Sequence, residues 1–445
     1  MDPSSRLPLE LLQKVFQHYL SDRKTPVHSF DHSDGLWIIG QINSTWRRAT
    51  LSNAPFWSAI HATFAYPPDP ATDSSDRNAI RLSTQTDLAA ILNGEEIDDS
   101  QYNGVRSMVL TNGVIQCLTC ILSRSRDIPL SVCVRFPIQI PRNTIPPTWR
   151  TFFSLLTAES SRVQCLELVV PTLIWDDLAV VLPSRFQILQ KLHATIESGS
   201  EFAPFISCCP TLADLAIRSL HRSSVSRIND ATRVDQSSIP MPHLHRLELV
   251  YASSFLDSVH AQNLKSLTLI SNSVEAFMSH APPLADFLHR SKCALTNFDL
   301  SWRGSVDDRL IILSRIPTLE SFTCRSDLNA VFYERMTLPS TILPRLRAFS
   351  LQIRESITRL ANLGRGPRPV ADATSVIDMV ESRMSGGVLQ SVDVRYIMVD
   401  YLSEGSKRRL SNLNATPSVV VEIEQFSGDL VQSRIRRYID AIGAR

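Results

Sequence analysis

The segments Leu244-His245-Arg246-Leu247-Glu248-Leu249 and Leu264-Lys265-Ser266-Leu267-Thr268-Leu269 share one pattern, in which leucines occupy the first, fourth and sixth positions. The last two leucines of each segment alternate with other residues, which is typical of a strand buried on one face. Clear further copies have their apolar residues at Leu212/Leu215/Ile217, Leu295/Phe298/Leu300 and Leu346/Phe349/Leu351, and weaker copies at Val105/Met108/Leu110, Val163/Leu166/Leu168, Leu189/Leu192/Ala194, Leu319/Phe322/Cys324 and Leu389/Val392/Val394. One strand-forming unit therefore recurs along most of the chain.

Helix-like stretches separate several of these copies. Helix-like stretches are expected within 112–124, within 273–287 with a break near Pro282-Pro283, and within 373–384, and a strand is expected at 130–136. Strands that alternate with helices indicate an α/β fold with parallel strands.

The recurring unit resembles an irregular leucine-rich-repeat solenoid, in which parallel strands line the concave side and helices and loops the convex side. The mean interval of about 32 residues exceeds the usual 20–29, and the asparagine ladder of regular repeats is mostly missing. A conventional α/β domain also alternates strands with helices, but the repeated Leu-x-x-Leu-x-Leu string argues against it. On such a solenoid, the side chains of Glu248, Thr268, Asp299 and Ser350 would face a bound target.

A different pattern opens the chain. Apolar residues form a helical stripe within 7–20, where Pro8 suits the first turn. A second helical pattern runs over 37–49, a third short piece restarts at 53–57, and 21–35 is a polar connection. Three short helices within about 60 residues bury little surface, so this region needs a partner or the rest of the chain to complete its core.

The order of motifs in this region resembles the F-box, most closely that of fungal, basidiomycete-type proteins with leucine-rich-repeat-like bodies. The matching residues are Leu7-Pro8-x-Glu10-Leu11-Leu12-x-x-Val15-Phe16, then Ile39-x-x-Ile42-Asn43-x-x-Trp46-Arg47-x-Ala49, then Pro55-x-Trp57. Two features depart from the family: Asn43 stands where many members carry Cys or Ser, and the loop between the first two helices is long. Neither departure removes an apolar contact position.

The resemblance implies a partner. An F-box binds the small Skp adaptor, which links it to a cullin scaffold and a RING subunit. The candidate interface and core residues are then Leu7, Pro8, Leu9, Leu12, Val15, Phe16, Ile39, Ile42 and Trp46. Each large side chain that becomes fully buried contributes about 1.5–3 kcal/mol. Periodicity alone leaves open the alternative that these residues only hold a local three-helix unit against the rest of the chain.

These patterns predict three regions. An F-box domain spans 1–64, a linker and the start of the body span 65–100, and the repeat body spans 101–445. An amphipathic helix at Asp429–Ile442, within 428–445, is expected to cap the open end of the array.

Composition argues against several classes of function. The formal charge of +1 gives no overall field for nucleic acid, and no stretch approaches the ~20 apolar residues that cross a bilayer. Met1–Ser5 lacks the basic and apolar regions of a signal peptide, so we expect a cytoplasmic or nuclear protein. The eight cysteines are scattered, as expected for small buried apolar residues in a reducing compartment.

No motif indicates catalysis. Cys117-x-x-Cys120 lacks a second pair at zinc spacing and is interpreted as core packing, while His243 and His245 are expected to be exposed to solvent. P-loop, Gly-x-Ser-x-Gly and His-Glu-x-x-His motifs are absent from the sequence. We therefore expect a non-enzymatic chain without cofactor or metal, and the resemblance to the F-box implies a substrate receptor of an SCF-type ubiquitin ligase. The alternative is a repeat scaffold for protein–protein interaction without a ligase role, and the sequence singles out no target.

Overall fold

The computed structural model describes two compact units. The described residues are 7–22, 29–32, 35–65, 108–136, 147–170, 186–196, 202–219, 238–270, 281–301, 305–325, 330–353, 373–398, 404–416 and 418–425. Unit 1 comprises Met1–Asp73, Asp98–His221 and Met241–Leu244, and unit 2 comprises Ser74–Ile97, Arg222–Pro240 and His245–Arg445. The helix expected at 429–442 and the expected linker, apart from Ala65, lie outside the described residues.

Unit 1 contains a sheet of parallel strands. The strands are β1 (Ala59–Ala65), β2 (Met108–Val109), β3 (Leu130–Arg135), β4 (Val163–Val169), β5 (Lys191–Ile196) and β6 (Asp214–Ser219). Their order in space is β6-β5-β4-β3-β1-β2, and neighbouring strands run parallel. The strand expected at 130–136 is confirmed as β3. Strand β1 was not expected from the sequence, and it lies inside the sheet, between β2 and β3.

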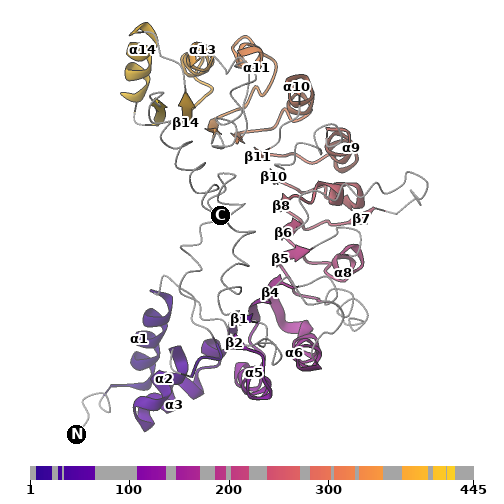
Figure 1. Ribbon diagram of the computed structural model, residues 1–445, viewed down its shortest axis with the longest axis vertical. Coiled ribbons are helices and arrows are strands. Elements are labelled where there is room, and N and C mark those ends of the chain that lie inside the picture. The colour runs from indigo at the N-terminus through magenta and orange to yellow at the C-terminus, as the bar shows by residue number, and fades with distance from the viewer. Residues whose placement is uncertain are drawn as a thin grey trace, which may run out of the picture. The chain divides into compact units, whose positions relative to one another are not determined.

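All helices of unit 1 except the short η6 fall into two groups. The helices are α1 (Leu9–Ser21), α2 (Gly35–Ile42), α3 (Ser44–Ser52), η2 (Ala54–Trp57), α5 (Asn112–Ser125), α6 (Pro147–Ala158), η6 (Ser160–Arg162) and α8 (Ala203–Ser207). Helices α5, α6 and α8 lie along one side of the strands (Figure 1). The remaining four helices before β1, within residues 7–57, are called the N-terminal helical module below. Helix α5 confirms the helix expected at 112–124.

Two expectations for the N-terminal helical module were wrong. The pattern over 37–49 predicts one helix, but Asn43 has an extended backbone that separates α2 from α3. The Asn43 side chain accepts a hydrogen bond from the backbone N–H of Trp46 at 2.8 Å, which caps α3. The expected polar connection at 21–35 contains Phe30, which is only 1% exposed and packs against Phe64 and Phe152 in the core of unit 1.

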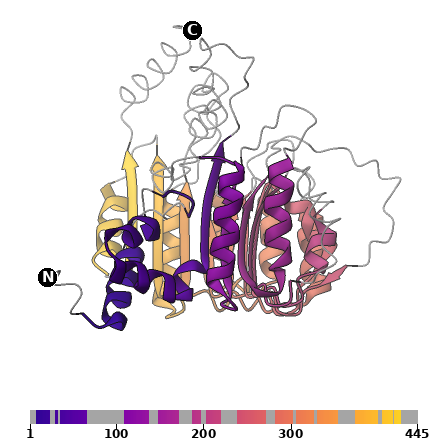
Figure 2. The same ribbon diagram turned by 90° about the horizontal axis from the view of Figure 1, so that it is seen from below.

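Unit 2 continues the alternation of strands and helices. Its strands are β7 (Ile239–Pro240), β8 (Arg246–Val250), β9 (Val259–His260), β10 (Ser266–Ile270), β11 (Asn297–Ser301), β12 (Ser321–Cys324), β13 (Ala348–Ile353), β14 (Ser391–Met398) and β15 (Val419–Gln425). Strands β8 and β10 to β15 follow one another in space as they do in the chain, and neighbouring strands are parallel. Strands β7 and β9 form a separate parallel pair. Seen from below, the strands stand side by side with their helices along one face (Figure 2).

The helices of unit 2 are η8 (Ser253–Ser258), α9 (Ala281–Ser291), α10 (Val306–Ser314), α11 (Ala330–Met336), α13 (Ala373–Ser385) and α14 (Glu404–Asn414). Helix α13 confirms the helix expected at 373–384. The helix-like stretch expected at 273–287 was expected to break near Pro282-Pro283, and the structure describes α9 from Ala281 onward, with both prolines in its first turn, where a missing N–H is tolerated. Residues 273–280 lie outside the described part.

A backbone ladder explains how the repeated pattern builds unit 2. The carbonyl oxygen of His245 accepts hydrogen bonds from the N–H groups of Lys265 and Ser266, each at 2.9 Å. The corresponding carbonyls of Lys265, Thr296, Glu320 and Arg347 each accept two bonds from the following copy in the same way. The apolar positions of the copies are buried, with Leu264, Leu295 and Leu346 each 0% exposed. The mixed α/β architecture and parallel strands expected from the sequence are therefore confirmed.

Candidate functional site

A small apolar core holds the N-terminal helical module together. Leu12 and Phe16 of α1 are each 2% exposed and pack with Ile39 of α2 and Ala49 of α3. Leu9, Trp46 and Phe56 are partly buried against this cluster. The rings of Phe16 and Trp46 lie 4.9 Å apart, and Gln13 donates hydrogen bonds to Ala49 O at 3.3 Å and Ser52 Oγ at 3.2 Å. Helix α1 is thus fixed on α3 by both apolar and polar contacts.

The same module carries most of the large apolar side chains that are exposed in the described residues. Of ten exposed large apolar side chains there, seven belong to this module: Leu7, Leu11, Val15, Tyr19, Ile38, Ile42 and Leu51. Leu7, two residues before α1, and the three exposed residues of α1 recur at every fourth position, as do the two of α2. Residues four apart lie on one face of a helix, so each helix presents an apolar stripe to solvent. Contiguous exposed apolar surface marks an interaction site more often than single residues do.

The structure divides the nine candidate interface and core residues into three groups. Leu12, Phe16 and Ile39 are buried, and they hold the helices together. Leu9 and Trp46 are partly buried at the edge of that core. The exposed members of the set are Leu7, Pro8, Val15 and Ile42, of which Val15 and Ile42 are 55% and 56% exposed.

Four exposed apolar residues were missed by sequence reasoning, namely Leu11, Tyr19, Ile38 and Leu51. Leu11 and Tyr19 lie four residues on either side of Val15, and Ile38 lies four residues before Ile42. Extending the stripe from each motif residue in steps of four would have found these three. Leu51 of α3 has no such signal.

In β8, β10, β11 and β13 of unit 2, polar residues alternate with the buried apolar residues. In register, Thr268 of β10 lies opposite Glu248 of β8 and Asp299 of β11. Arg325 donates hydrogen bonds to both carboxylate oxygens of Asp299, at 3.2 and 2.7 Å. Burial nevertheless raises the pKa of Asp299, with a smaller contribution from the charge of Glu248, and Arg325 opposes the shift. Glu248, Thr268, Asp299 and Ser350 are all partly exposed, as a contact surface requires.

Unit 1 places His61, Cys133, Glu167 and His193 in one row across adjacent strands. Arg135 forms an ion pair with Glu167. Burial and then the charge of Glu167 raise the pKa of the Cys133 thiol to about 12, so it is protonated at neutral pH and is a poor nucleophile. No group of three acidic, histidine or cysteine side chains within the described residues is arranged to hold a metal ion.

The cysteine and histidine expectations had mixed outcomes. All eight cysteines are free thiols, but only Cys209 and Cys324 are buried. Cys117 and Cys120 are partly exposed, and the Sγ atom of Cys117 lies 3.3 Å from Nε2 of His32, so the expectation of core packing was wrong for this pair. His243 and His245 are exposed, as expected.

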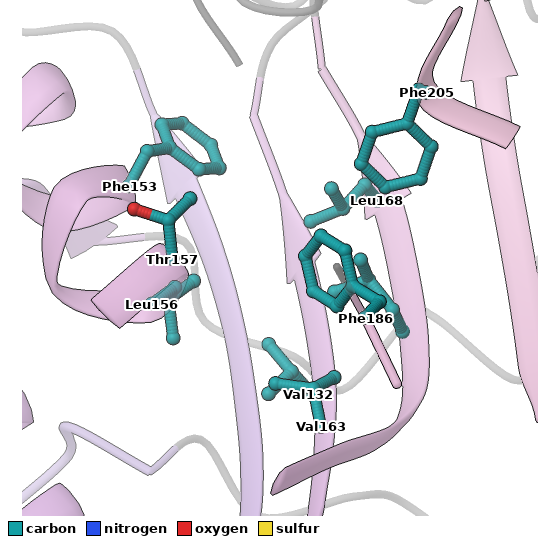
Figure 3. Close-up of a pocket in the computed structure, with 9 residues that line it drawn as sticks. Val132, Phe153, Leu156, Thr157, Val163, Leu168, Phe186 and Phe205 are labelled. Atoms are coloured by element: carbon teal, nitrogen blue, oxygen red, sulfur yellow. The ribbon is translucent and has the colours of Figure 1, made fainter. Parts of the chain in front are cut away.

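A cavity in unit 1 has a lining unsuited to a ligand (Figure 3). Its volume of about 20 Å³ admits roughly one water molecule. The lining residues are Val132, Phe153, Leu156, Thr157, Val163, Leu166, Leu168, Phe186 and Phe205. The single hydroxyl, Thr157 Oγ1, already donates to Ser154 O at 2.9 Å. With no convergent polar groups in its lining, this space is a packing defect rather than a binding site.

The exposed stripes of the N-terminal helical module are thus the strongest candidate site in the described residues. Comparison with family models and with curated proteins gives no match. No helix in the described part of the chain is both long and apolar enough to cross a membrane. What the stripes can do chemically is bury apolar area against another protein.

Proposed function

We propose that this chain is the substrate-receptor subunit of an SCF-type cullin–RING ubiquitin ligase. The N-terminal helical module acts as an F-box that docks the Skp adaptor, and the body, an irregular leucine-rich-repeat-like solenoid, recruits a protein target. The observation that carries the proposal is the pair of exposed apolar stripes on α1 and α2. They stand on helices whose residues also follow the motif order of the F-box.

The energetics favour docking over isolation. Each of the seven exposed side chains contributes up to about 1.5–3 kcal/mol when it becomes fully buried. Part of that gain offsets the loss of translational and rotational freedom on association, about 4–15 kcal/mol. Burial of these side chains can therefore stabilise a specific interface, whereas their exposure to water contributes no free energy to the stability of the isolated chain.

The mechanism we propose is proximity. The chain performs no bond chemistry; docking and target capture raise the effective concentration of a target lysine near the ubiquitin carrier. The partly exposed residues of β8, β10, β11 and β13 supply the surface for the target. They are mixed in charge and small, and they favour no particular class of target protein.

The alternative is a repeat scaffold for protein–protein interaction in which the N-terminal helical module only completes the body. One observation favours this alternative. Phe30 is buried among Phe64 and Phe152, so the segment between α1 and α2 does serve the core of unit 1. The exposed stripes have no role in that account, which is why we prefer the ligase.

A double substitution tests the proposal. Val15→Asp with Ile42→Asp changes two side chains that are 55% and 56% exposed, so folding is preserved while the stripes gain charge. We expect the wild-type chain to co-purify with a co-expressed Skp adaptor and the double variant to lose it. The affinity loss should be at least about 100-fold, because charges placed in an apolar interface lack partners.

A matched control uses the same chemical changes elsewhere. Val331→Asp with Ile311→Asp alters residues of α11 and α10 that are 46% and 51% exposed, and it should leave adaptor binding intact. Failure of the wild-type chain to bind the adaptor, or equal binding by both double variants, would exclude the docking role.

A further inference from the structure

One cation joins the N-terminal helical module to α5. The guanidinium carbon of Arg124 lies 4.6 Å from the ring centre of Trp57 and 5.7 Å from that of Trp37. The two indole rings meet edge to face, with centres 5.4 Å apart. Trp37 belongs to α2 and Trp57 ends η2, so Arg124 contacts two separate elements of the module through cation–π attraction.

Hydrogen bonds fix both rings in place. Trp37 Nε1 donates to the carbonyl oxygen of Ser29 at 2.7 Å, and Trp57 Nε1 donates to that of Thr50 at 2.9 Å. The ring of His32 lies 4.6 Å from that of Trp37 and also touches Cys117 of α5. Contacts other than that with Arg124 therefore already fix the positions of both indole rings.

A second anchor ties the module to the sheet itself. The N–H of Ser29 donates to the carbonyl oxygen of His61 in β1 at 2.8 Å, and the N–H of His61 donates to Ser29 Oγ at 2.9 Å. Phe30 packs against both Phe64 and Phe152, with ring centres 6.1 and 6.2 Å away. Two contacts thus join the module to the rest of unit 1. Residues 29–32 attach it to β1, and Arg124 attaches it to α5.

We propose that Arg124, Trp37 and Trp57 form an orientation joint that holds the adaptor-docking helices at one angle to the sheet of unit 1. The inference rests on the proposed function, because a proximity mechanism depends on the geometry in which two bound partners are held. Apolar contacts alone let elements slide. A cation placed over two perpendicular rings is directional, so it resists rotation of α2 and η2 against α5.

Arg124 is a positioning residue in this proposal, and its test measures orientation in the full-length chain. Spin labels are attached through ketone-bearing amino acids at Arg48 on α3 and Ser154 on α6, both exposed, which leaves the native cysteines untouched. Electron–electron resonance then gives the distribution of distances between the two labels. We expect one narrow peak in the parent chain and loss of that peak in Arg124→Gln, which removes the charge.

The conservative variant Arg124→Lys keeps a cation and should restore the narrow peak. The Skp adaptor should bind all three proteins equally, because the exposed stripes are unchanged. The proposed joint would be refuted if Arg124→Gln showed an equally narrow peak. It would also be refuted if the distribution were broad in both Arg124→Gln and Arg124→Lys. If circular dichroism shows that Arg124→Gln is unfolded, Trp37→Leu serves as the second variant and is judged by the same two outcomes. Absence of adaptor binding by the parent chain counts against the proposed function and leaves the joint itself unaffected.

Discussion

Arg383 shows how one side chain can hold neighbouring parts of unit 2 together. It is 0% exposed, and its guanidinium donates to three backbone carbonyls, those of Met336 at 2.6 Å, Leu343 at 2.9 Å and Ile342 at 2.7 Å. Burial lowers the pKa of this guanidinium. The carbonyls lie at the end of α11 and in the segment that follows it, so a residue of α13 satisfies polar groups that helix formation leaves open.

Replacing this side chain should therefore be costly. Arg383→Met keeps much of the volume but leaves buried carbonyl groups without donors, at about 1–3 kcal/mol each. We expect the free energy of unfolding to fall by about 3 kcal/mol or more, measured by urea denaturation of the full-length chain. Arg345→Met removes an exposed arginine nearby and should change it by less than about 0.5 kcal/mol. Equal effects of the two substitutions would show that the buried bonds contribute little.

At the scale of elements, periodicity located the interiors of helices and strands, but local polar chemistry decided where they end. The apolar spacing over 37–49 is continuous, so the sequence pattern could not reveal the break that the side-chain cap at Asn43 creates. Strand β1 was missed for a different reason. Its residues 59–65 lack the leucine pattern, and its place between β2 and β3 depends on pairing with strands far along the chain.

The burial of Asp299, which pairs with Arg325 just after β12, gives unit 2 a specific pH dependence. Asp299 titrates above the ordinary value of 3.8 because burial disfavours its charged form. The folded state therefore holds this proton more tightly than the unfolded state does. The contribution of Asp299 to stability is largest at low pH and falls as pH rises through the folded-state pKa.

Comparing the wild-type chain with Asp299→Asn isolates this dependence. The difference in free energy of unfolding, wild type minus variant, should decrease as pH is raised from 3.8 through the raised pKa and then level off. Chemical denaturation at a series of pH values measures it. A difference that increases with pH would mean that the attraction of Arg325 outweighs burial.

For the whole molecule, the sequence predicted the class of architecture better than the details of the site. Parallel strands could be predicted because the leucine pattern recurs and its apolar positions are buried in every clear copy. The division of motif residues into core and surface could not, since Leu12 and Val15 fall in the same helical stripe. Only the packing of α1 on α3 buries the first and leaves the second exposed.

Hydrogen exchange distinguishes the ligase subunit from the scaffold at the level of the whole chain. If the Skp adaptor docks on the exposed stripes, binding at a hundred times the dissociation constant stabilises the docked region by about 2.7 kcal/mol, or roughly 100-fold in protection. Amides of α1 to α3 should gain this protection, while those of β10 to β13 in unit 2 should not change. The scaffold predicts full protection of α1 to α3 without adaptor and no change when it is added. Protection gained equally in the chain carrying Val15→Asp and Ile42→Asp would place the contact away from the stripes, because each stripe then carries a charge.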